Sequence, residues 1–199
     1  MNTLERFEKK TVVYNNPSIN LLNIFKKNNI KKKYPNRKVT SIYFDTHNFD
    51  LYSISKDGIK KRNKIRIRWY DDNIEKSLIE IKSKNNQITK KVRYKNDHII
   101  NFNNLKNLKI KYEGLIYFPK IIISYFREYY SLNNLNITLD KKLTFKSINL
   151  LNQKKYKNNI IEVKFDKKDY IKALLIMKKF NMRQSRFSKY VIGIDTIYG

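Results

Sequence analysis

Residues 64–70 read KIRIRWY, a stretch in which basic and apolar side chains alternate. Successive side chains of an extended strand point to opposite faces. One face would be apolar and the other polar, with Ile65, Ile67 and Trp69 opposite Arg66, Arg68 and Tyr70. Because a half-exposed strand with a solvated basic face has the same pattern, the stretch predicts a strand and a basic face but gives that face no role.

Several other segments repeat this alternation. Strands are predicted at residues 5–13, 39–46, 76–84, 87–95, 120–130 and 158–165, and residues 84–86 predict a hairpin turn. Charged side chains share one face in most of these strands: Arg6, Glu8 and Lys10; Glu80 and Lys82; Lys91 and Arg93; Arg127, beside Ile123 and Tyr125; Glu162 and Lys164. The repetition predicts an antiparallel sheet that gathers charge on one side.

Helices and loops are predicted between these strands. Residues 167–180 have the clearest helical spacing, with Ile171, Leu174 and Leu175 as the apolar stripe. Another helix is predicted within residues 16–33, with Ser18 as its N-cap. The other expectations are a basic loop through Lys33 and Pro35, a short helix or turn ending at Gly58, a partly helical or looped section at 97–119, and two strands or a hairpin at 133–145.

The length and composition suit one domain over residues 1–199, with a mass of 24.2 kDa. Cysteine is absent, which excludes disulfides and thiolate metal sites. The sequence has neither a long apolar run nor an N-terminal signal pattern. We therefore expect a soluble, cytoplasmic protein with no membrane segment.

The formal net charge of +27 predicts anionic partners such as nucleic acid, acidic lipid or phosphate polymers. Many lysines belong to a general Lys, Asn and Ile bias, so the arginines are more informative, because their planar fork binds phosphate with two hydrogen bonds. Small barrels of about eight strands leave an interior wide enough for side chains or one ligand. Cations crowded into such an interior would need an anion there.

The ordered run of segments VTSIYFDTHNFDLYSISKDG, KIRIRWY, LIEIKSK, ITKKVRYK, YFREYY, NITLD, IIEVKF and FSKYVIGID resembles the VTC domain, the catalytic domain of polyphosphate polymerases. That domain is similar to the CYTH-like triphosphate tunnel metalloenzymes. The resemblance spans nearly the whole chain. It implies an α+β fold, an antiparallel β-barrel tunnel with flanking helices, whose basic wall binds triphosphate or polyphosphate beside a divalent cation.

The resemblance also implies site residues. The phosphate-binding set is Lys10, Arg66, Arg68, Lys82, Lys91, Arg93, Arg127, Ser188 and Lys189, and within it Arg66, Arg68, Lys82 and Arg127 would act on the transferred group. Glu162 matches the family's metal-binding glutamate, with Mg²⁺ or Mn²⁺ as the ion. Asn136 departs from the pattern, because the family commonly has a basic residue at its place.

Phosphoryl transfer needs positioning and charge neutralisation, which Arg, Lys and a divalent ion supply. We expect a metal-dependent polyphosphate polymerase that uses ATP. The alternatives are an inorganic triphosphatase or polyphosphate hydrolase, and a non-catalytic polyanion-binding module, for which the charge alone suffices. Nucleic acid is not expected as a specific partner, and the oligomeric state is left open.

Some residues are given structural roles. Glu162 has an alternative role as the ion-pair partner of a nearby lysine. Glu8 and Glu80 are expected to balance Lys10 and Lys82, or to hold the metal through water. We expect His47 and His98 at the surface, Tyr43, Phe44 and Trp69 in the core, and Asp45 as a strand-end cap.

Overall fold

The computed structural model describes residues 6–13, 21–86, 88–98, 100–179 and 187–199. Its strands are β1 (Arg6–Val13), β2 (Lys31–Asp45), β3 (Arg62–Tyr70), β4 (Asn73–Asn85), β5 (Ile88–Lys95), β6 (Ile110–Tyr112), β7 (Leu115–Leu132), β8 (Leu135–Ser147), β9 (Gln153–Lys155) and β10 (Asn159–Asp166). Its helices are α1 (Leu21–Lys27), α2 (Asp50–Lys56), α3 (Tyr170–Lys179) and α4 (Lys189–Tyr198), with 3₁₀ turns η1 (Phe102–Asn107) and η2 (Lys167–Asp169). None of the helices in these ranges is long and apolar enough to cross a membrane.

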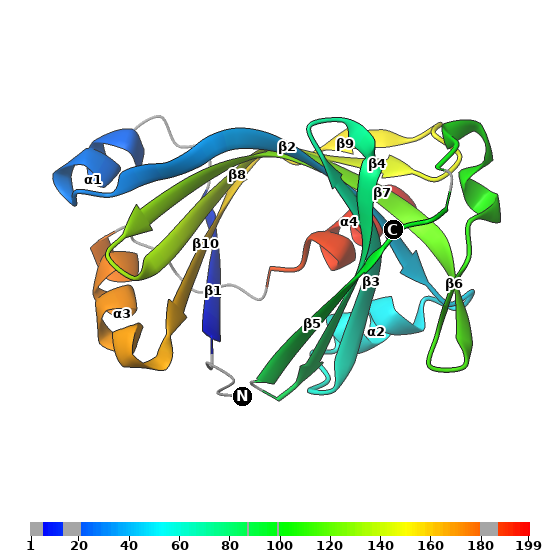
Figure 1. The fold of residues 1–199 in the computed structure, drawn as a ribbon, viewed down its shortest axis with the longest axis horizontal. Coiled ribbons are helices and arrows are strands. Elements are labelled where there is room, and N and C mark those ends of the chain that lie inside the picture. The colour runs from blue at the N-terminus through cyan, green and yellow to red at the C-terminus, as the bar shows by residue number, and fades with distance from the viewer. Residues whose placement is uncertain (1–5, 14–20, 87, 99, 180–186) are drawn as a thin grey trace. The chain divides into compact units, whose positions relative to one another are not determined.

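The strands pair in the order β1-β10-β8-β7-β2-β3-β4-β5, with β6 on β7 and β9 on β8 (Figure 1). The chain divides into two compact units. The first unit contains Met1–Arg37, Phe126–Leu143 and Tyr156–Phe187, and the second contains Lys38–Tyr125, Thr144–Lys155 and Ser188–Gly199. The prediction of a single domain over residues 1–199 stays a prediction.

The core of the second unit confirms the alternation in β3. Ile65, Ile67 and Trp69 are 0–3% exposed and pack with Leu51 of α2 and Leu105 of η1. Burying their apolar area is favourable by about 25 cal/mol per Å². The opposite face of β3 is left with its arginines, so the period-two pattern correctly predicted which side is packed.

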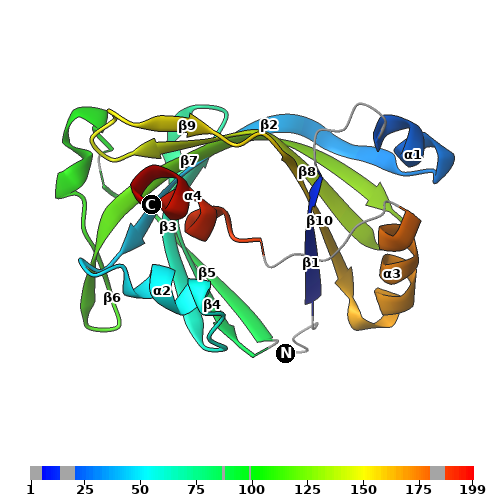
Figure 2. The same cartoon turned by 180° about the vertical axis from the view of Figure 1, so that it is seen from behind.

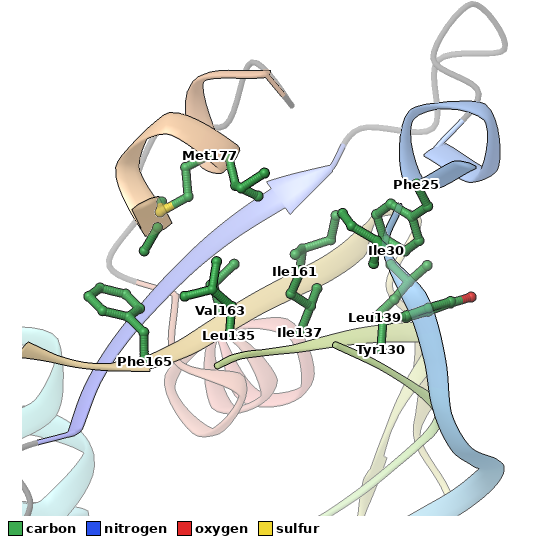
Figure 3. Close-up of a cluster of buried hydrophobic side chains, with 12 residues drawn as sticks. Phe25, Ile30, Tyr130, Leu135, Ile137, Leu139, Ile161, Val163, Phe165 and Met177 are labelled. Atoms are coloured by element: carbon green, nitrogen blue, oxygen red, sulfur yellow. The ribbon is translucent and has the colours of Figure 1, made fainter. Parts of the chain in front are cut away.

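The core of the first unit lies between its strands and helices α1 and α3 (Figure 3). Helix α3 buries Ala173, Ile176 and Met177 there. The predicted stripe is wrong, because Ile171, Leu174 and Leu175 are 67%, 40% and 57% exposed. The helix is apolar on more than one side, and only packing against β10 selects the face that contains the small Ala173.

Two other predictions, one of a loop and one of a break between strands, are also wrong. The basic loop through Lys33 and Pro35 is the first half of β2, whose pairing with β3 covers only Val39 to Phe44. Proline lacks the N–H that a strand donates to its neighbour, which is why the sequence favoured a loop at this position. Strand β8 continues through Lys142, which has a left-handed backbone (φ 53°), so residues 135–147 form one strand instead of two.

The section at 97–119 is partly strand. It contains η1 as expected, but β6 and the start of β7 form a hairpin around Glu113 and Gly114, both at positive φ. Two positive-φ residues match the twist of a tight hairpin. Gly58 follows α2 as predicted, and α1 lies within 16–33, whereas its predicted cap, Ser18, lies outside the described residues.

Candidate functional site

The register of β2 to β5 aligns polar side chains across four strands. In one row across the strands, Tyr43 of β2 lies opposite Arg66 of β3, and Arg66 lies opposite Glu80 of β4. Glu80 in turn lies opposite Arg93 of β5. Directly opposed residues of an antiparallel ladder project from the same face. The next rows are Ser41 with Arg68, and Lys64 with Lys82 and Lys91. The predicted set of Arg66, Arg68, Lys82, Lys91 and Arg93 therefore shares one face, which we call the β3–β5 face.

Glu80 is the centre of this face. Its carboxylate is only 2% exposed and accepts hydrogen bonds from Arg66, at 2.9 Å from Nε and 2.7 Å from Nη2. Arg93 Nε lies 3.0 Å away, Arg68 Nη1 lies 3.8 Å away, and Lys91 forms a further ion pair. Burial opposes the ionisation of Glu80, but Arg66 and Arg68 outweigh it and hold the pKa of this carboxyl well below its usual range.

The two arginines of β3 have further polar partners. Arg66 donates to the Tyr43 hydroxyl at 2.8 Å. Arg68 is 5% exposed and donates from Nε to Ser41 Oγ at 2.9 Å and from Nη2 to the Tyr125 hydroxyl at 3.1 Å. These contacts orient both guanidinium groups. Tyr43, Phe44 and Trp69 are buried, as predicted, although the Tyr43 hydroxyl also belongs to the polar network.

Two groups on the β3–β5 face titrate near neutral pH. Burial, with the charge of Arg66, lowers the pKa of Lys91 to about 8 despite its hydrogen bond to Glu80. Burial opposes ionisation of Tyr43, but Arg66 and Arg68 outweigh it and lower its pKa to about 8. Raising the pH through 8 therefore removes a positive charge at Lys91 and adds a negative charge at Tyr43.

We expect the affinity for long-chain polyphosphate to fall from about pH 7 to about pH 9, because both pKa values lie near 8 and both ionisations make the face less positive. Internal phosphates of a long chain do not titrate in this range. Equilibrium binding at constant ionic strength checks the result. Tyr43→Phe and Lys91→Arg should each flatten the pH profile, whereas a flat wild-type profile contradicts the prediction.

Helix α4 brings the predicted C-terminal pair to the same group of side chains. Ser188 is its N-cap and accepts a hydrogen bond from Lys64 Nζ at 2.7 Å. Lys189 Nζ lies 4.8 Å from the centre of the Tyr125 ring. Tyr125 is in turn hydrogen-bonded to Arg68, so Lys189 is joined to the face through an aromatic ring.

Asp45 fixes α2 and α4 to the end of β2. Fully buried, it accepts hydrogen bonds from the amides of Thr46, Leu51 and Tyr52 at 2.7–2.9 Å and from the Tyr190 hydroxyl at 2.5 Å. The predicted role of Asp45 as a strand-end cap is confirmed. Helices α2 and α4 lie side by side (Figure 2), and the Tyr52 hydroxyl also bonds Asp195.

The first unit has its own charged row. Lys10, Glu162 and Thr138 are opposed across β1, β10 and β8. Glu162 is 5% exposed, with Lys164 Nζ at 2.7 Å and Lys10 Nζ at 3.5 Å. Glu8 balances Lys10 at 2.6 Å, as predicted. Within the described ranges, no group of three or more His, Cys, Asp or Glu side chains could hold a metal ion.

Arg127 and Asn136 belong to the same unit. Arg127 makes a bidentate ion pair with the fully buried Asp140. Its Nε donates to Oδ1 at 2.6 Å and its Nη2 donates to Oδ2 at 2.8 Å. Asn136 accepts a hydrogen bond from Lys33 Nζ at 2.7 Å, so a lysine of β2 stands beside the position that lacks a basic residue.

The structure thus gathers Arg66, Arg68, Lys82, Lys91, Arg93, Ser188 and Lys189 in the second unit and Lys10, Arg127 and Glu162 in the first. Sequence reasoning missed Asp140, the polar roles of Ser41, Tyr43 and Tyr125, and the central position of Glu80. Ser41 and Tyr43 alternate with apolar residues in their strand, so pairing that strand with KIRIRWY could have found them. His47 and His98 are exposed, as predicted.

The sequence profile of the VTC domain matches residues 5–198. The chain belongs to the VTC domain family. No curated protein matches the sequence. The VTC match covers nearly the whole chain and confirms the resemblance seen in the ordered motifs. It places this protein in a family related to polyphosphate and triphosphate.

Solved structures share the fold of this VTC domain at low sequence identity. A Hippeastrum protein described as having a dominant triphosphatase activity has a TM-score of 0.54 and 16% identity and covers 96% of both chains. A candidate adenylate cyclase from Vibrio parahaemolyticus has a TM-score of 0.57 and 13% identity, over 94% of this chain and 97% of its own. A Pyrococcus horikoshii protein has a TM-score of 0.55 and 12% identity, over 92% and 97%. These similarities confirm the predicted triphosphate tunnel fold class.

Proposed function

We propose that this VTC domain is a metal-dependent phosphotransferase that lengthens polyphosphate with the terminal phosphate of ATP. The observation that carries the proposal is the β3–β5 face, where Arg66, Arg68, Lys91 and Arg93 surround one buried carboxylate. Phosphoryl transfer requires positively charged groups that position the phosphates and neutralise their charge, and oriented guanidinium and ammonium groups supply both. The family pattern assigns Lys10, Arg127, Ser188 and Lys189 to phosphate binding as well.

The divalent ion is assigned to Glu162, because its buried carboxylate is a hard oxygen donor. The residues fit a Mg²⁺ or Mn²⁺ ion that takes one protein carboxylate and completes its shell with phosphate oxygens and water. Lys10 and Lys164 now balance that carboxylate and would turn to phosphate when substrate arrives. When bound, the ion neutralises charge on the phosphoryl groups.

Hydrolysis of inorganic triphosphate is the second candidate function. The same side chains would act with water as the acceptor, and the Hippeastrum structure of this fold is described with triphosphatase activity. At 16% identity that structure supports the fold, and the activity stays a candidate for this chain.

One experiment separates the three interpretations. Purified protein is incubated with ATP or tripolyphosphate and with Mg²⁺ or Mn²⁺, and the products are resolved on a gel. Polyphosphate longer than the input supports the polymerase, and free phosphate alone supports the hydrolase. If the protein binds polyphosphate but shows no metal-dependent turnover, the result supports the non-catalytic polyanion-binding module.

Arg68→Lys is expected to weaken tripolyphosphate binding roughly tenfold although the net charge is unchanged. An ammonium group cannot reproduce the hydrogen bonds to Ser41 and Tyr125 that orient the guanidinium. Isothermal titration against wild type checks the affinity, and Arg37→Lys, at an exposed position, is the matched control. Equal affinities for Arg68→Lys and wild type would mean that Arg68 acts only as a diffuse charge.

A further inference from the structure

The cations around Glu80 fall into two classes by exposure. The side chains of Arg66 and Arg68 are 18% and 6% exposed, whereas those of Lys91 and Arg93 are 31% and 58% exposed. All four meet the same carboxylate. Lys91 and Arg93 are therefore the pair that an arriving anion can reach most easily.

The two classes also differ in their other partners. Arg66 is held by Tyr43, and Arg68 by Ser41 and Tyr125. In the part of the chain that the structure describes, Lys91 and Arg93 have Glu80 as their polar partner and no other. Loss of Glu80 would leave Arg66 and Arg68 oriented but would leave Lys91 and Arg93 without a counter-ion.

Carboxylate and phosphate oxygens bind the same forks and ammonium groups with similar geometry. A phosphoryl group near Lys91 and Arg93 therefore competes with Glu80 for them. The buried carboxylate is ionised at neutral pH, because its neighbours hold its pKa low, so this competition is present under all ordinary conditions.

We propose that Glu80 is a built-in substitute for a phosphoryl group. It holds Lys91 and Arg93 in place while the β3–β5 face is empty and yields them to an incoming triphosphate or polyphosphate. This rests on the anion-binding part of the proposed function and not on catalysis. The consequence is a lower affinity of the β3–β5 face for phosphate, because Glu80 competes for the same two cations. When a bound phosphate chain dissociates, the Glu80 carboxylate takes its place beside Lys91 and Arg93.

The test is Glu80→Gln, which keeps the size of the side chain and removes its charge. Asp97→Asn is the control, because it changes the net charge by the same amount at a solvent-exposed position. Asp97 is 84% exposed, follows the end of β5, and pairs at 3.9 Å with Lys95, which is 86% exposed. Thermal unfolding is measured with sodium tripolyphosphate and with sodium chloride at equal ionic strength, in EDTA and without metal. Affinity is measured by titration calorimetry.

We expect Glu80→Gln to unfold at a lower temperature than wild type in chloride, because a buried counter-ion is lost. Tripolyphosphate should restore much of this loss and raise the unfolding temperature of the variant more than that of wild type. Its affinity should increase at least about threefold, since one negative charge near the ligand is gone. Asp97→Asn should behave as wild type in each measurement.

An equal tripolyphosphate shift for Glu80→Gln and wild type, or weaker binding by the variant, overturns the proposal. If Glu80→Gln does not fold in chloride, folding rescued by tripolyphosphate supports the proposal, and failure of that rescue overturns it. Arg93→Gln gives an independent measurement: its affinity should fall at nearly unchanged stability, and wild-type affinity overturns the proposal. Absence of turnover with ATP affects only the proposed function, because these measurements contain neither metal nor nucleotide.

Discussion

Replacing Glu162 with glutamine is expected to reduce metal-dependent phosphoryl transfer by about two orders of magnitude or more while polyphosphate binding persists. Glutamine keeps the size of the side chain but removes the charge that anchors the divalent ion. Such an ion contributes several kcal/mol of charge stabilisation, which corresponds to at least a hundredfold in rate. Binding should remain equal or become tighter, because a negative charge leaves the vicinity of Lys10 and Lys164.

Metal titrations of turnover and of equilibrium binding, on the same protein, measure both effects. Glu128→Gln is the matched control in the same unit, since Glu128 is a partly buried glutamate paired with Lys141 at 2.8 Å. The control should keep its turnover. Wild-type turnover of Glu162→Gln at low metal concentration would make Glu162 an ion-pair partner only, and the metal would have to be sought at Glu8 or Glu80.

The second large effect is expected at Asp45. Asp45→Ala removes the acceptor for three backbone amides and the Tyr190 hydroxyl. Buried donors left without an acceptor cost about 1–3 kcal/mol each, although some will reach water after relaxation, so we expect a loss of roughly 3–4 kcal/mol. For a chain of this length, the unfolding temperature should fall by roughly 6–16 °C.

Thermal and denaturant unfolding check this prediction, with Asp57→Ala as control. Asp57 is exposed and follows α2. Among the residues that the structure describes, its backbone N–H donates to the Ser53 carbonyl and its side chain has no hydrogen bond. Because Asp45 holds Tyr190, the residue next to Lys189, the variant should also bind tripolyphosphate more weakly. Matching stability of the two variants would show that the hydrogen bonds of Asp45 contribute little.

Local patterns were enough to predict the parts of this protein that depend on chain geometry alone. The alternation in residues 64–70 fixes which side chains share a face, because successive residues of any strand point to opposite sides. The same rule correctly placed Glu80 with Lys82, Lys91 with Arg93, and Glu162 with Lys164 on shared faces. The ordered motifs also identified the family.

Local patterns did not predict features that depend on contacts with distant parts of the chain. The apolar side of α3 could not be chosen, because Ile171 and Ile176 are equally apolar and only the surface of β10 distinguishes them. Strands β2 and β8 run past a proline and a left-handed lysine, two local signals that favour a loop or a break. Strand β8 pairs with β10 before Lys142 and with β9 after it, and these long-range pairings are not visible in the local pattern.

The sequence by itself determined the family, the strand faces and the set of charged residues on each face. Only the tertiary structure decided how those charges pair. Arg66 and Arg93 are far apart in the chain, and the register of β3, β4 and β5 brings both to Glu80. The physical reason is that period-two alternation is a property of one strand, whereas an ion pair between strands depends on their relative offset, and a shift of one residue would move Glu80 to the other face.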